Sequence, residues 1–107
     1  MNLEIGEYVR TEIGTIGKVV RINEIYFTIE NNRGEIDVLY EGNQRHSKNI
    51  IDLIEVGDYV NGKEIHEIDE NRKRLYSYEK DDYNIILNRD IQRVVTKQQF
   101  SNIEYRL

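Results

Sequence analysis

Cysteine is absent from this 107-residue sequence. Its absence excludes a disulfide framework, thiolate metal ligands and a cysteine nucleophile. Because secreted domains of this size usually depend on disulfides, we expect a cytoplasmic protein. The sequence also lacks any apolar run near the roughly 18 residues that a membrane-spanning helix needs, so we expect no membrane segment.

Proline and alanine are absent too, whereas isoleucine occurs 16 times, asparagine 11 times and tyrosine 8 times. Alanine is the best helix former, while isoleucine, valine, tyrosine and threonine favour strands, so the composition predicts a β-rich fold. The missing residues have GC-rich codons and the abundant ones have AT-rich codons. This bias indicates an AT-rich genome, such as that of a low-GC Gram-positive bacterium or one of its phages.

Basic residues are fewer than acidic ones, 15 against 20, and the net charge is −5. General nucleic-acid binding depends on lysine and arginine side chains that neutralise phosphates, and this balance argues against it. An acidic surface keeps a small protein in solution or complements a basic protein partner. We therefore expect a protein partner before a nucleic acid.

Short strands separated by turns account for most of the sequence. Residues 31–34 and the pair Asn61 and Gly62 are hairpin signals, because asparagine and glycine tolerate positive φ. Ile36, Val38 and Tyr40 continue the apolar alternation on the returning strand of the first hairpin. The pattern predicts an all-β protein, a small barrel or sandwich of roughly seven to nine short antiparallel strands.

Helix is expected only near the end of the chain. A strand over residues 91–95 leads to Thr96, whose hydroxyl can cap a single helical turn over residues 97–100. Residues 103–107 are then expected to form the last strand. The sequence therefore predicts at most one or two helical turns.

A five-residue echo connects the two halves of the sequence. Residues 5–9, of sequence Ile-Gly-Glu-Tyr-Val, recur as Val-Gly-Asp-Tyr-Val at residues 56–60. A glycine permits a tight turn, the acid can accept a backbone N–H there, and tyrosine and valine start a strand. We interpret residues 1–107 as a single domain with an internal repeat over 1–45 and 50–107, although chance similarity also explains so short an echo.

Two resemblances follow from these segments. The opening strand and turn resemble SH3-like barrels of the KOW type, through residues 5–11, Gly14, residues 16–19 and Ile22. Residues 46–49, 57–62 and 95–100 are similar to small proteins of clostridial phages and prophages.

The resemblances imply a function in binding. KOW-type modules usually bind RNA or a partner protein. A small acidic phage protein is expected to be a non-catalytic accessory protein of the host cytoplasm, and in particular an anti-CRISPR-like inhibitor that occupies a surface of a bacterial defence protein. A nucleic-acid or nucleotide-binding module and a phage structural protein are the alternatives.

Catalytic and cofactor motifs are missing from the sequence. His46 and His66 belong to no metal-ligand pattern, and Ser47, Ser77 and Ser101 lie in no nucleophile elbow. The glycines of residues 14–18 are too closely spaced for a phosphate-binding loop. We therefore expect neither enzymatic activity nor a bound metal or cofactor.

An acidic surface around the first hairpin is the first candidate binding site. Glu30, Glu35 and Asp37 cluster there in the sequence, and they would dock on a basic protein.

A basic and aromatic tip is the alternative site. Arg72, Lys73 and Arg74 precede Tyr76 and Tyr78, so cations could contact phosphates while the rings stack on bases. The same residues fit a solvated turn with cross-strand tyrosines. Four tyrosines are expected opposite the apolar faces and thus exposed, namely Tyr26, Tyr40, Tyr76 and Tyr78. The oligomeric state stays open, with a homo-oligomer among the alternatives.

Overall fold

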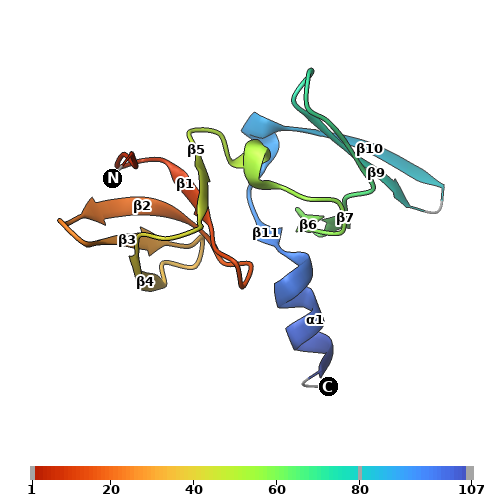
Figure 1. Ribbon diagram of the computed structural model, residues 1–107. Coiled ribbons are helices and arrows are strands. Elements are labelled where there is room, and N and C mark those ends of the chain that lie inside the picture. The colour runs from red at the N-terminus through yellow and green to blue at the C-terminus, as the bar shows by residue number, and fades with distance from the viewer. Residues whose placement is uncertain (1, 80, 106–107) are drawn as a thin grey trace.

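The computed structural model describes residues 2–79 and 81–105, which form eleven strands, two short 3₁₀ helices and one α-helix (Figure 1). All sheet pairings in this part of the chain are antiparallel, which confirms the all-β prediction. The strands outnumber the seven to nine expected from sequence, because several in the second half are only two or three residues long.

An N-terminal unit, residues 2–47, contains one five-stranded sheet of order β4-β3-β2-β1-β5. Its strands are β1 (Tyr8–Arg10), β2 (Ile16–Ile22), β3 (Tyr26–Glu30), β4 (Ile36–Tyr40) and β5 (Arg45–Ser47). The predicted hairpin turn at residues 31–34 joins β3 to β4, with Gly34 at φ +79°.

A C-terminal unit, residues 50–95, contains two three-stranded sheets of order β10-β9-β8 and β11-β6-β7. Its elements are η1 (Ile50–Leu53), β6 (Tyr59–Val60), β7 (Lys63–Glu64), β8 (Glu67–Asp69), β9 (Arg74–Glu79), β10 (Asp82–Leu87), η2 (Asn88–Asp90) and β11 (Val94–Val95). Only Ile65 and His66 separate β7 from β8. If β7 and β8 are counted as one bent strand, the C-terminal order becomes β10-β9-β8/β7-β6-β11. This order matches β4-β3-β2-β1-β5 of the N-terminal unit, strand for strand.

The echoed segments form turns of the same geometry. Gly6 and Gly57 have φ of +95° and +98°. The Glu4 backbone N–H donates to the Glu7 carboxylate at 2.9 Å, and the Glu55 backbone N–H donates to the Asp58 carboxylate at 2.7 Å. The local turns are therefore built alike, while the interpretation of 1–45 and 50–107 as copies of one unit stays a prediction.

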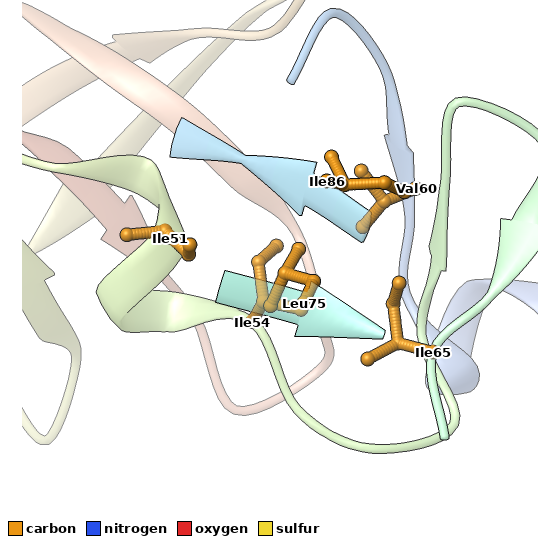
Figure 2. Packing of buried hydrophobic residues seen from close by; sticks show 6 residues of the cluster. All are labelled: Ile51, Ile54, Val60, Ile65, Leu75 and Ile86. Carbon is orange, nitrogen blue, oxygen red and sulfur yellow. The ribbon is translucent and has the colours of Figure 1, made fainter. Parts of the chain in front are cut away.

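Each unit has its own buried cluster. The N-terminal cluster consists of Val9, Val19, Phe27 and Ile29. The C-terminal cluster, shown in Figure 2, consists of Ile51, Ile54, Val60, Ile65, Leu75 and Ile86. Ile16 belongs to β2 but packs against the C-terminal cluster, so apolar burial also joins the two units.

The last described residues form helix rather than the predicted strand. Helix α1 spans Lys97–Tyr105, so the predicted single turn continues, and residues 106–107 lie outside the described residues. Thr96 and Gln99 form a reciprocal capping box, with N–H to side-chain oxygen distances of 3.0 and 3.3 Å. In the described part of the chain, no helix is long and apolar enough to cross a membrane.

One face of β4 is open to solvent. Ile36, Val38 and Tyr40 are 53%, 60% and 69% exposed, whereas Leu39 packs against the N-terminal cluster. β4 is the edge strand of its sheet, and its other face covers the core because Leu39 lies opposite buried Phe27 of β3. The strand before residue 96 is also shorter than expected, since it contains only Val94 and Val95.

Candidate functional site

Three tyrosines gather on the outward face of the β8-β9-β10 sheet. Leu75 and Ser77 are buried, so strand alternation turns Tyr76 and Tyr78 outward. The β9–β10 register places Tyr83 opposite Tyr78. The same register places Ile85 opposite Tyr76 and completes what we call the tyrosine face: Tyr76, Tyr78, Tyr83 and Ile85.

The rings of the tyrosine face contact one another and remain open to solvent. The Tyr78 and Tyr83 centroids are 5.3 Å apart, and Tyr76 lies 6.1 Å from Tyr83. Tyr78, Tyr83 and Ile85 are 45%, 60% and 47% exposed. Clustered exposed tyrosines are typical of protein interfaces, because each gives a large rigid contact area and a polar hydroxyl.

Carboxylates border this face along β8. Glu67 lies opposite Tyr76 and accepts a hydrogen bond from the Tyr78 hydroxyl. This hydrogen bond raises the pKa of Tyr78 to about 12, because it stabilises the neutral phenol. A shallow cleft of about 570 Å³ is lined by Glu67, Asp69 and Glu70 together with Tyr76 and Tyr83. This combination suits a cation, because an arginine guanidinium can stack on a tyrosine ring and form an ion pair with a neighbouring carboxylate.

The predicted basic tip is largely neutralised. Lys73 Nζ lies 2.5 Å from an Asp52 carboxylate oxygen, and its hydrogen bond holds the pKa of Asp52 below its usual value. Arg72 Nε lies 3.9 Å from the Asp69 carboxylate. Arg74 is half-buried in β9, opposite Asp69. The structure brings the cluster close to Tyr76 and Tyr78 as predicted, but with acids beside the cations.

The predicted acidic residues are all exposed around the β3–β4 hairpin, but cations accompany them as well. Glu35 accepts a hydrogen bond from Asn31 and lies 4.0 Å from Arg33. Glu35 and Asp37 line a hollow that Arg33 and Arg93 also line. Glu30 lies opposite Ile36 at the start of β4. The charge of this surface is therefore partly compensated.

Another hollow, of about 370 Å³, lies between the two units. Ile16, Ile50 and Val94 line it, and Lys18 Nζ lies 5.6 Å from the Tyr8 ring centroid on one side. Its volume is within the range of small-ligand pockets. Its lining mixes aliphatic and polar side chains and includes one aromatic ring, Tyr8, and one carboxylate, Glu30. Several rings and carboxylates converge at the tyrosine face, so we place the candidate site there.

Both histidines have structural partners. His66 Nδ1 accepts the Tyr78 backbone N–H at 3.0 Å, and Nε2 lies 2.9 Å from Glu64. His46 Nδ1 lies 3.2 Å from Glu7. No group of three or more histidine, aspartate or glutamate side chains that could hold a metal occurs among the described residues.

A buried ionic network joins the units and was missed in the sequence. Arg10 and Asp58 are 2% and 0% exposed and form a two-point ion pair. Arg10 also donates to the Leu53 carbonyl and the Gln98 side chain. Asp58 accepts the Lys97 backbone N–H at 2.9 Å. The echo marked Asp58 as a turn residue, but nothing in the sequence pairs it with an arginine 48 positions away.

Tyr83 and Ile85 were also missed as site residues. Of the tyrosines predicted to be exposed, Tyr40 and Tyr78 are exposed, and Tyr26 and Tyr76 are half-buried. The register of the β9–β10 hairpin is the signal that identifies Tyr83, because it places Tyr83 opposite Tyr78.

No protein family, curated protein or solved structure matches this chain. The resemblances to KOW-type barrels and to clostridial phage proteins stay predictions.

Proposed function

We propose that this protein is a non-catalytic binding protein that occupies a basic surface of a protein partner through its tyrosine face. The observation that carries the proposal is the exposed Tyr78–Tyr83 pair beside the carboxylate of Glu67. Arginine side chains are the groups that such a surface suits best, because they combine a flat stacking plane with a permanent charge. The net charge of −5 would speed the approach to a basic partner.

A component of a bacterial defence system is the partner class implied by the phage resemblance. The nucleic-acid channel of such a protein presents arginine and lysine side chains to phosphates. An acidic, tyrosine-bearing sheet could fill that channel and exclude the nucleic acid. Inhibition would then require occupancy alone, with no chemistry on the target.

Nucleic-acid or nucleotide binding at Arg72–Arg74 is the second candidate. The tyrosines do lie next to these cations, as stacking on bases would require. Two of the three cations already pair with Asp69 and Asp52, and phosphates would have to displace those carboxylates. This arrangement favours the basic protein partner.

Capture from a bacterial lysate tests the proposal with two matched variants. The Tyr78→Ser/Tyr83→Ser double variant removes the exposed ring pair, and the Glu30→Gln/Glu35→Gln/Asp37→Asn variant neutralises the other acidic surface. We expect a basic protein retained by the wild-type chain and by the acid variant but lost with the tyrosine variant. The proposal would be overturned if the tyrosine variant still retained the partner. It would also be overturned if nucleic acid were captured and its capture depended on Arg72, Lys73 and Arg74.

A further inference from the structure

At the free edge of β4, the backbone groups of every second residue point away from the sheet. The Asn31 N–H donates to the Glu35 carbonyl at 3.0 Å, which makes these two a hydrogen-bonded pair. Because such pairs alternate in an antiparallel ladder, residues 37 and 39 bond to β3, and residues 36, 38 and 40 direct their N–H and C=O groups away from it. The Tyr40 carbonyl accepts the Gln44 side-chain amide at 2.8 Å, and a carbonyl oxygen can accept a second bond.

The same residues carry the exposed apolar side chains of β4. Ile36, Val38 and Tyr40 lie on the face away from the core, with Tyr26 of β3 beside Tyr40. Edge strands are normally protected by lysine, proline, a bulge or a covering segment. β4 has no lysine or proline, and its pairing with β3 runs without a register shift. It is therefore a strand suited to accept another strand.

We propose that two copies of this chain associate by antiparallel pairing of their β4 strands about a twofold axis at Val38. In this register Val38 lies opposite Val38 of the second copy, and Ile36 lies opposite Tyr40. Asp37 lies opposite Leu39, so no acid faces an acid within the strand. The two sheets then form one continuous sheet, and the apolar side chains form one band across the junction.

Charge limits the strength of the pairing at its ends. Continued beyond the strands, the register brings Glu35 near Glu41 of the second copy. Arg33 lies 4.0 Å from Glu35 and compensates part of this repulsion. Since both acids are exposed, added salt should screen them and tighten the dimer.

The equivalent edge strand of the C-terminal unit, β10, is less suited to the same pairing. β10 runs directly into η2, where the Asn88 side chain accepts the Ile51 backbone N–H at 3.1 Å. Leu87 at that end is half-buried. β4 is followed by an exposed loop over residues 41–43 instead, which leaves room for a second strand. Ile85 of β10 is thus the matched control for Val38.

Cysteine crosslinking tests the register, because the chain has no cysteine of its own. Hydrogen-bonded antiparallel partners have Cα atoms about 5.5 Å apart, within the disulfide range. We expect Val38→Cys to form a covalent dimer under mild oxidation, and Ile85→Cys to stay monomeric under denaturing, non-reducing electrophoresis. Equal crosslinking of both variants, or crosslinking at Ile85 alone, would overturn the proposal.

Sedimentation equilibrium of the unmodified chain gives a second readout. We expect a dimer that Val38→Lys converts to monomer and that Ile85→Lys leaves intact, with circular dichroism as the check that both variants fold. A wild-type chain that is monomeric at all concentrations up to about 1 mM, a weak limit for specific association, would contradict the proposal.

Discussion

At the scale of single residues, the most constrained group in the molecule is the Arg10–Asp58 pair. It lies where the two units meet, and both α1 and the turn before β6 contribute hydrogen bonds to it. A charge buried this completely is tolerated only when it is paired and fully hydrogen-bonded. The pair therefore fixes the relative placement of the units, in addition to the apolar contact of Ile16.

Removing one partner of the pair should be far more costly than the same change in the echoed turn. We expect Asp58→Ala to lower the free energy of unfolding by about 3 kcal/mol, because buried Arg10 loses its two-point partner and keeps only the Glu55 carboxylate, 3.4 Å from its Nε, as a counter-charge. Glu7→Ala, the matched change, removes a carboxylate whose partners are exposed His46 and the Glu4 backbone N–H, at a cost of about 1 kcal/mol. Urea denaturation measures both, and equal losses would contradict the role of the pair.

The ionisation of Tyr78 is a second test at this scale. Its pKa is raised to about 12 because its hydroxyl donates to the Glu67 carboxylate, which favours the neutral phenol. We expect Glu67→Gln to lower that pKa toward the ordinary value of about 10. Ultraviolet titration of tyrosinate should then show one tyrosine ionising at lower pH than in the wild-type chain. An unchanged titration curve would mean that Glu67 does not engage the hydroxyl.

At the scale of elements, sequence reasoning succeeded where the determinants are local. The turns at residues 31–34 and at Asn61 and Gly62 are each specified by a few adjacent residues. The Thr96 cap was local too, and the structure confirms it. The extent of α1 was not predictable in this way, since β-branched and aromatic residues after Phe100 favour strands by propensity.

The parts of the site that escaped prediction depend on long-range pairing. Asp58 and Arg10 belong to different units and are 48 positions apart, so no local pattern pairs them. Likewise, strand alternation alone did not reveal which face of β4 covers the core, because that depends on the register with β3, which places Leu39 opposite buried Phe27. Tyr76 and Tyr78 were identified from sequence, but their acidic neighbours came from β8 and became visible only in the sheet.

Docking of α1 against the β1–β2 turn gives a prediction at this scale. A Cβ on Gly14 would lie 2.5 Å from Thr96 Oγ1 and 2.7 Å from Gln98 Cβ. Gly6 has almost the same φ, +95° against +90°, but a Cβ there would meet nothing within 4 Å. We expect Gly14→Ala to destabilise the fold by about 1–3 kcal/mol more than Gly6→Ala, which measures backbone strain alone. Thermal unfolding compares the two, and similar losses would show that the helix is not held at Gly14.

At the scale of the whole molecule, the two proposed surfaces lie far apart. The molecule is elongated, with extents of 50 × 37 × 22 Å, and Figure 1 places β4 at one side and β9 and β10 at the other. A dimer formed through β4 would therefore leave both tyrosine faces free. Two sites on one particle can bind a repetitive or dimeric partner more tightly than one site can.

The most direct test of the account is a nuclear magnetic resonance titration of the isotope-labelled chain with a hexa-arginine peptide. The central claim is that the tyrosine face recognises arginine through stacked rings and adjacent carboxylates. We predict that the largest shifts occur at Tyr76, Tyr78, Tyr83 and Glu67, and that Tyr78→Ser/Tyr83→Ser abolishes them. Shifts centred on Glu30, Glu35 and Asp37, or shifts that the tyrosine variant leaves unchanged, would contradict the claim.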